Sequence, residues 1–241
     1  MRTPFTGAGT ALVTPFTRSG DLDEAAVRRM GRRQIDGGIH FLAPCGTTGE
    51  NPTLTASERR RIVEILAEEA GGKVPILAGA GGYNTKEVIE LARELAKAGA
   101  NGFLSVTPYY NKPTQEGLYQ HYRAFAESTS LPIVVYNVPG RTGVNVEPAT
   151  IARLADIPNI VGVKEASGNV SQMCEIVRAV PSRFIVNTSG CGIPSRTITC
   201  WTIFYIAPSR RIGSSPTEII PATRHSSAFP TPRPSKAPVS V

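Results

Sequence analysis

The sequence predicts one α/β domain in which parallel strands close into a (β/α)8 barrel. Short apolar runs typical of buried strands alternate with helical segments between residues 9 and 186. Strict alternation of this kind indicates parallel strands joined by right-handed crossovers. Unusual polar residues follow several different strands, which is where a barrel gathers its catalytic groups. The chain of 241 residues is long enough for one large domain of this type.

A doubly wound open sheet is the competing architecture for a chain with this alternation. A dinucleotide-binding sheet would carry the pattern GxGxxG directly after its first strand. Here Thr14-Pro15-Phe16 stands at that place, and Gly79–Gly82 (GAGG) after the third strand is only a glycine-rich turn. The polar residues at several strand ends therefore favour the barrel.

The predicted elements follow in order along the chain. Strands are expected over residues 9–16, 38–45, 74–80, 102–106, 133–136, 160–164 and 184–186. Asp21 or Asp23 can cap the first helix, Thr55–Glu58 (TASE) forms a capping box for the second, and Asn84 can cap the third. Further helices are expected over 115–128, from Pro148 onward, and over 170–180.

The net charge of +7 is unevenly distributed and does not indicate nucleic-acid binding. Residues 187–241 hold six basic residues and one acidic residue, whereas residues 1–186 hold 20 basic and 18 acidic residues. The main body is therefore nearly neutral. It shows no basic stripe interleaved with aromatic residues, so no nucleic-acid partner is expected.

The expected compartment is the cytoplasm. Residues 1–20 lack the continuous apolar region of a secretory signal, and no apolar run approaches the length of a membrane span. The four cysteines are scattered without a CxxC pair, and the three histidines lie far apart. We therefore expect no disulfide framework, no metal site and no membrane partner.

Lys164 is the residue around which we expect the site to be organised. It follows the apolar run 160–163, and it shares one strand face with Gly162 and Ala166. Tight apolar surroundings disfavour the ammonium and lower its pKa from about 10.4. A neutral amine can form a Schiff base with a ketone. The ordinary alternative is a lysine that reaches solvent from the end of a strand.

Four further side chains can supply the remaining chemistry of such a site. Tyr136 ends the fifth strand and can move protons, because no histidine stands at a strand end. Thr47 and Thr48, with the N–H groups of their loop, can bind a carboxylate, and Arg141 can bind a second one. The alternatives are ordinary turn chemistry for the threonines and a core position for the tyrosine.

Four segments resemble the dihydrodipicolinate synthase family, within the N-acetylneuraminate lyase superfamily of pyruvate-dependent class I aldolases. They are Gly46–Glu50 (GTTGE), Thr107–Asn111 (TPYYN), Tyr136–Gly143 (YNVPGRTG) and Gly162–Ala166 (GVKEA). The resemblance covers residues 5–186. It implies a (β/α)8 barrel and a homotetramer built from dimers, and no cofactor is expected.

The resemblance also implies a role for each candidate residue. Lys164 would form the imine with pyruvate, and Tyr136 would donate and accept protons through Thr47 and Tyr110. In the family, the tyrosine matching Tyr110 reaches in from the neighbouring subunit. Thr48 would bind the pyruvate carboxylate, and Arg141 would bind the carboxylate of L-aspartate 4-semialdehyde. The implied product is 4-hydroxy-tetrahydrodipicolinate, in lysine and diaminopimelate biosynthesis.

Two other functions are compatible with the same residues. Relatives in the superfamily use the same lysine and tyrosine as sialic acid or 2-keto-3-deoxy sugar acid lyases, so another Schiff-base 2-oxo-acid aldolase is the alternative enzyme. A catalytically impaired barrel that serves as a binding partner is the third. The paired threonines and the arginine favour the dipicolinate branch.

Residues 187–241 depart from this pattern. They are rich in Ser, Thr, Pro and Arg, with eight prolines in 55 residues, and only Trp201–Ala207 (WTIFYIA) has the composition of a strand. We therefore expect a catalytic domain over 1–186 and an aberrant tail over 187–241, disordered or read out of frame. The barrel is expected to be incomplete at its C-terminal end, with unpaired edges on its first and seventh strands.

Overall fold

The computed structural model describes residues 3–189 and the strand backbone at 198–202. Parallel strands form one eight-stranded sheet. They are β1 (Gly9–Ala11), β2 (Phe41–Ala43), β3 (Leu77–Gly79), β4 (Gly102–Val106), β5 (Ile133–Asn137), β6 (Ile160–Glu165), β7 (Ile185–Ser189) and β8 (Ile198–Thr202). Their order is β2-β1-β8-β7-β6-β5-β4-β3. The two ends of this order meet through a parallel bridge between Leu42 and Ile76, so the sheet closes into the predicted barrel.

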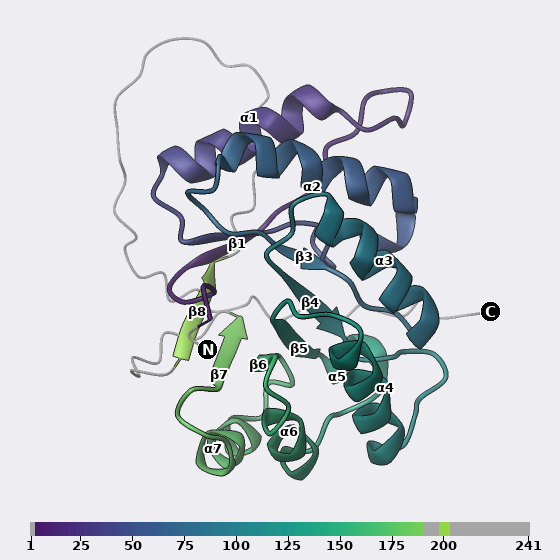
Figure 1. Ribbon diagram of the computed structural model, residues 1–241, viewed down its shortest axis with the longest axis vertical. Helices are drawn as coiled ribbons and strands as arrows, with labels where there is room; N and C mark the ends of the chain where they lie inside the picture. Colours follow the sequence, from purple (N-terminus) through teal and green to yellow (C-terminus); the bar gives the residue numbers. More distant parts are fainter. Residues whose placement is uncertain (1–2, 190–197, 203–241) are drawn as a thin grey trace, which may run out of the picture. The chain divides into compact units, whose positions relative to one another are not determined.

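Helices connect the strands and lie outside them (Figure 1). They are α1 (Glu24–Asp36), α2 (Ala56–Ala70), α3 (Thr85–Lys97), α4 (Gln115–Glu127), α6 (Pro148–Ala155) and α7 (Val170–Ala179). A short 3-10 turn, η1 (Asn51–Thr53), follows β2, and a short helix, α5 (Pro139–Thr142), follows β5. Within the described part of the chain, no helix combines the length and the apolar character that a membrane crossing requires.

The predicted helix starts are confirmed by their capping hydrogen bonds. Asp23 accepts the N–H of Ala26 at 2.8 Å, and Asn84 accepts the N–H of Lys86 at 3.1 Å. Thr55 and Glu58 form the reciprocal capping box of α2. These contacts satisfy N–H groups that have no partner within the first turn of a helix. The sequence therefore located the helices through their first residues.

The first three strands are shorter than predicted, with three residues each in the ladder. The second predicted run ends at Cys45, which follows β2 and has a φ of 56°. A non-glycine residue in this left-handed region ends an extended segment. Leu12 after the first of these strands stays buried, whereas Val13 is 37% exposed, so the apolar run continues beyond the ladder only in part.

The eighth strand is a correction to the sequence analysis. β8 pairs with β7 through Val186–Ser189 and with β1 through Gly9 and Thr10, so β1 and β7 have no unpaired inner edge. The segment ITCWT consists largely of β-branched and aromatic residues, which favour strands. It overlaps the strand-like stretch that begins at Trp201. Residues 190–197 and 203–241, the rest of the predicted tail, lie outside the described residues.

Two buried layers hold the barrel together. The outer layer lies between strands and helices and includes Leu66, Phe103 and Phe125. The inner layer fills the barrel with alternate strand residues, among them Phe41 and Leu77. Period-two alternation sends neighbouring residues of each strand to different layers. The packed interior leaves room for a site only at the carboxyl ends of the strands.

Candidate active site

Lys164 and Tyr136 lie side by side at the carboxyl ends of β6 and β5. The register of these parallel strands pairs the two residues directly, so their side chains leave the sheet on the same face. The Nζ atom of Lys164 lies 4.4 Å from the centre of the Tyr136 ring. The two residues are 5% and 8% exposed. The structure thus brings together two residues that the sequence placed on consecutive strands.

The surroundings of Lys164 favour its neutral form. Burial lowers its pKa from 10.5 to about 8, and the positive charge of Arg141 adds to the effect. A group with such a pKa is neutral in about a tenth of molecules at pH 7, against well under a thousandth for an ordinary lysine. The neutral amine is the nucleophilic form, so Lys164 is suited to Schiff-base formation.

Tyr136 is set to hold its proton at neutral pH. Burial raises its pKa above 10.0, and a side-chain hydrogen bond with Thr47 and the charge of Arg141 partly offset this rise. A protonated phenol beside an amine can donate a proton to an oxygen that leaves the carbon under attack. The hydrogen bond to Thr47 connects that phenol to the loop after β2.

One cavity of about 650 Å³ joins five of the six predicted residues, which are Thr47, Thr48, Tyr136, Arg141 and Lys164. Small side chains such as Ala43 and Ala166 line the same cavity and leave its volume open. An adjoining cavity of about 240 Å³ shares Thr47, Tyr136 and Arg141 with it. Cationic, hydroxyl and amine groups therefore converge on a space that suits a small anionic substrate.

The loop that carries Thr47 and Thr48 is held from two sides. The Thr14 hydroxyl, in the loop after β1, donates to the carbonyl oxygen of Gly49 at 2.7 Å. On the other side Gly79 of β3 lies so close that a β-carbon there would come within 1.9 Å of the Cys45 carbonyl oxygen. Neighbouring strands thus fix the height of the threonine pair above the barrel.

Arg141 reaches the cavity from helix α5, which the sequence analysis did not predict. Pro139 starts this helix and Gly143, with a φ of 68°, ends it. That arrangement is a known signature of helix ends and could have revealed the helix. Arg141 is exposed, so its charge lies at the rim of the cavity. A guanidinium at this place can bind an incoming carboxylate.

Tyr110 is the predicted residue that the single chain does not bring to the cavity. It is 88% exposed and lines none of the cavities described here. Its φ of 68° is unusual for a tyrosine, because L-residues other than glycine rarely occupy the left-handed region. The backbone therefore holds this ring away from the chain's own barrel.

Other reactive groups near the site do not compete with Lys164. Cys45 lines the adjoining cavity, but burial raises the pKa of its thiol to about 12, and the charge of Arg59 only partly opposes this. A protonated thiol is a poor nucleophile. Among the described residues, no group of three or more His, Cys, Asp and Glu side chains could hold a metal ion.

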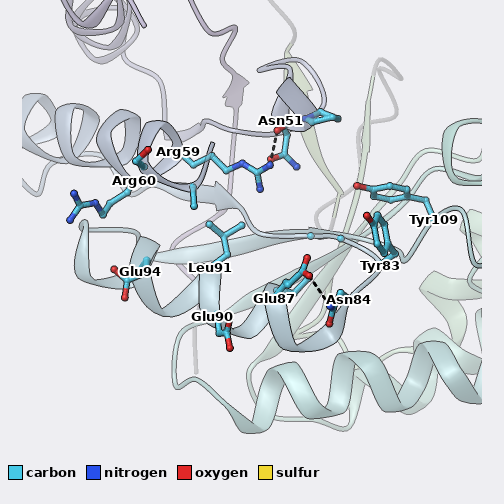
Figure 2. Close-up of a pocket in the computed structure, with 16 residues that line it drawn as sticks. Asn51, Arg59, Arg60, Tyr83, Asn84, Glu87, Glu90, Leu91, Glu94 and Tyr109 are labelled. Carbon is cyan, nitrogen blue, oxygen red and sulfur yellow. Dashed lines mark hydrogen bonds between the residues drawn. The ribbon is translucent and has the colours of Figure 1, made fainter. Parts of the chain in front are cut away.

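A larger cavity of about 760 Å³ lies beside the candidate site, between the start of α2 and a face of α3 that extends to Glu94 (Figure 2). Its labelled side chains include Arg59, which donates to the Asn51 carbonyl oxygen at 2.7 Å, and Asn84, which donates to Glu87 at 2.8 Å. None of its lining residues is a lysine, and none of the six predicted residues lines it. Schiff-base chemistry therefore points to the smaller cavity.

Sequence reasoning missed a buried polar cluster behind the site, formed by Asn137, Asn145, Glu165 and Gln172. Asn137 donates to Glu165 at 2.9 Å, and Asn145 donates to Gln172 at the same distance. The available signal was the position of Asn137 and Glu165 in their strands. Each follows a site residue by one position and so points toward the helices, where an apolar residue is usual.

Comparisons with known proteins find similar sequences over most of this chain. The family model described as Dihydrodipicolinate synthetase family matches residues 4–192. A 4-hydroxy-tetrahydrodipicolinate synthase of Nitratidesulfovibrio vulgaris (strain DP4) is 50% identical over 206 residues, which are 80% of this chain and 70% of that protein. The enzyme of the same name from Chlorobium phaeobacteroides (strain BS1) is 54% identical over 183 residues, which are 76% of this chain and 62% of that protein.

Solved structures give the same result. Dihydrodipicolinate synthase from Thermotoga maritima superposes with a TM-score of 0.75 at 49% identity. The match covers 78% of this chain and 64% of that one. The enzyme from Aquifex aeolicus gives the same TM-score at 39% identity, over 77% of this chain and 63% of the other. This chain therefore spans just under two thirds of the solved chains that it matches.

Proposed function

The chain belongs to the dihydrodipicolinate synthetase family, and we propose that it condenses pyruvate with L-aspartate 4-semialdehyde through a Schiff base on Lys164. The product is 4-hydroxy-tetrahydrodipicolinate, and the enzyme is a lyase of lysine and diaminopimelate biosynthesis. The observation that carries the proposal is the buried amine of Lys164, 4.4 Å from the centre of the Tyr136 ring in an open cavity.

The first half of the reaction forms the imine. The neutral amine of Lys164 attacks the ketone carbon of pyruvate, and the Tyr136 phenol donates a proton to the departing hydroxyl, which leaves as water. One amine proton passes to the ketone oxygen as the carbinolamine forms, and Thr47 relays the second to Tyr136 through their side-chain hydrogen bond, which restores the phenol. Thr48 and the N–H groups of its loop bind the pyruvate carboxylate, because they lie beside the amine in the same cavity.

The second half joins the aldehyde and closes a ring. A proton moves from the methyl carbon to the imine nitrogen through Tyr136, which gives an enamine. The enamine carbon attacks the aldehyde carbon of the semialdehyde, the aldehyde oxygen takes up the proton of the nitrogen, and the imine forms again. Arg141 holds the carboxylate of that substrate at the rim of the cavity. The amino group of the semialdehyde then attacks the imine carbon and displaces Lys164, which releases the six-membered ring and restores the amine.

Tyr110 belongs to a second copy of the site in this proposal. Its exposed ring cannot reach the cavity of its own chain, so it completes the proton relay of a neighbouring subunit. The working form is then a homotetramer built from dimers. Within each dimer, Tyr110 of either subunit crosses the interface to the site of the other. We place the enzyme in the cytoplasm, the compartment that the scattered cysteines of the sequence suggest.

The alternative functions are not favoured by the relatives described above. Those relatives carry the name of the dipicolinate branch rather than that of a sugar-acid lyase. Arg141 at the rim of the cavity also suits a second substrate with a carboxylate near its reacting carbon. Turnover of pyruvate with the semialdehyde distinguishes this enzyme from another aldolase and from an impaired barrel.

Reduction with borohydride in the presence of pyruvate tests the proposal directly. The expected result is one stable adduct of pyruvate on Lys164, seen in the intact mass and placed by peptide mapping. Lys164→Arg should abolish the adduct, because a guanidinium stays protonated and cannot attack a ketone.

Lys97→Arg is the matched control for that experiment. Lys97 is exposed on α3 and pairs with Glu94 at 2.7 Å, so its replacement should leave trapping unchanged. An adduct on any lysine other than Lys164 would overturn the assignment of the nucleophile.

A further inference from the structure

The buried polar cluster of Asn137, Asn145, Glu165 and Gln172 lies directly behind the reacting pair. The register pairs Asn137 with Glu165 in the row that follows Tyr136 and Lys164. Successive strand residues point to opposite faces, so the cluster and the site share the same two strand ends. We propose that Glu165 is a positioning residue for imine formation, which fixes the spacing of Lys164 and Tyr136 through this cluster.

Glu165 is fully buried, with 0% exposure. Its Oε2 atom accepts from Asn137 Nδ2 at 2.9 Å and from Gln172 Nε2 at 3.2 Å, and its Oε1 atom accepts from the Ser167 N–H at 2.8 Å. No lysine or arginine of the described residues forms an ion pair with it. A buried carboxylate without a cation is costly, and its three accepted hydrogen bonds must offset that cost. The three donors depend on this acceptor in turn, so Glu165 holds its neighbours in one arrangement.

The carboxylate sets the orientation of the three amides around it. Asn137 Nδ2 also donates to Asn145 Oδ1 at 2.9 Å, and Gln172 Nε2 donates to the same oxygen at 3.0 Å. Asn137 Oδ1 in turn accepts the N–H of Val146 at 3.0 Å. An ionised carboxylate can only accept, so both amides must turn their N–H groups toward Glu165. The cluster thus ties β5 to β6, to the loop after α5 and to α7.

This tie bears on chemistry because proton transfer depends on geometry. The phenol of Tyr136 must reach the oxygen that leaves when Lys164 forms the imine, and small displacements of reacting groups lower rates steeply. Glu165 contacts neither the cavity nor a substrate, so it acts through the two strands. The inference rests on the proposed function for the reaction that it supports.

The matched variants are Glu165→Gln and the double variant Asn137→Asp with Glu165→Gln. Glu165→Gln keeps the shape of the side chain but replaces one acceptor oxygen with an NH2 group. That group then faces either the N–H donors of Asn137 and Gln172 or the N–H of Ser167. The double change supplies an acceptor at position 137, and rotation of the Asn145 and Gln172 amides then restores every contact of the cluster. Glu175→Gln removes an exposed carboxylate from α7 and serves as the control.

The rate of imine formation is measured by rapid mixing with pyruvate, borohydride quench and intact mass. Glu165→Gln should lower the maximal rate at least tenfold and leave the half-saturating pyruvate concentration within twofold, because the loop of Thr47 and Thr48 is not part of the cluster. The double variant should return to within threefold of the parent rate, and Glu175→Gln should equal the parent. A merely unfolded fraction would lower the amplitude of trapping and leave its rate unchanged.

An unchanged rate in Glu165→Gln, or a double variant as slow as the single one, would overturn the inference. A parent protein that forms no adduct on Lys164 would overturn the proposed function instead. In that case the role of Glu165 in positioning Lys164 is tested without pyruvate. The measurement is the rate at which trinitrobenzenesulfonate modifies the Lys164 amine. A change of at least threefold in Glu165→Gln that the double variant reverses supports it, and equal rates in all three proteins overturn it.

Discussion

Lys164 combines a buried position with a pKa of about 8, and this predicts the pH dependence of its reaction. The neutral amine attacks the ketone, so the rate of imine formation should rise with pH through about 8 and then level off. Tyr136 keeps its proton over this range, because burial raises its pKa above 10.0. Trapping rates with borohydride quench, measured across the pH range, check this. A rate that still rises steeply two units above pH 8 would contradict it.

Arg141 affects the second substrate more than the first, because it lies at the rim of the cavity. Arg141→Ala should still trap pyruvate on Lys164 but bind the semialdehyde roughly ten- to hundredfold more weakly, since a hydrogen bond to a charged group contributes about 1.5–3 kcal/mol. The same change removes a charge that lowers the pKa of Lys164, so the midpoint of the pH profile should move upward. Steady-state kinetics with each substrate varied in turn measures the first effect.

Arg141→Lys separates the charge of this residue from its shape. A lysine keeps the positive charge but lacks the planar fork that binds a carboxylate with two hydrogen bonds. The pH midpoint should then stay near that of the parent while the semialdehyde still binds more weakly. An unchanged apparent affinity for the semialdehyde in both variants would remove Arg141 from the site.

At the scale of elements, the contact between β3 and the loop after β2 sets the position of the threonine pair. Gly79→Ala would place a β-carbon 1.9 Å from the Cys45 carbonyl oxygen, and backbone cannot rotate away as a side chain can. We expect a loss of about 1–3 kcal/mol in the free energy of unfolding, as for other overpacked sites. Slower trapping of pyruvate should accompany it, because the loop must move. Thermal melts and trapping rates measure the two effects.

Gly140→Ala is the control for that substitution. It changes a glycine of α5 whose added β-carbon would meet no atom within 4 Å. Alanine is the better helix former by roughly 1 kcal/mol, so this variant should melt no lower than the parent. Equal melting temperatures for the parent and Gly79→Ala would show that the loop yields without cost.

At the scale of the whole molecule, the sequence changes character after residue 186. Six basic residues, one acidic residue and eight prolines fall within the last 55 residues. We propose that this part is read out of frame, and that another frame of the nucleotides beyond codon 186 encodes a glycine-rich turn, an apolar strand and amphipathic helices. The chain with that frame restored should melt at a higher temperature, because the restored strand and helices would bury additional apolar surface.

The nucleotide sequence decides this prediction first. If neither of the other frames encodes such elements, and the purified chain melts in one cooperative step with a protease-resistant C-terminus, the proposal of a shifted frame is wrong. The pairing of β8 with β1 and β7 already removes one reason to expect an unstable barrel.

Much of the fold could be predicted because it depends on local signals. Capping residues such as Thr55 and Asn84 act within one turn of a helix, and a short apolar run marks each strand. These signals together predict the alternation of strands and helices, and hence the barrel. Composition alone does not establish the strand β8. It depends on backbone groups of β7, which closely precedes it, and of β1, which lies at the other end of the described chain.

For the site, the sequence by itself determined the chemical groups and the ends of the strands that carry them. An amine, a phenol, two hydroxyls and a guanidinium follow from Lys164, Tyr136, Thr47, Thr48 and Arg141. Only the tertiary structure decided that these five share one cavity while Tyr110 points away from it, and that Glu165 ties their strands from behind. The physical reason is that burial, the pKa of Lys164 and the pairing of Asn137 with Glu165 arise from neighbours across the barrel, which lie far apart along the chain.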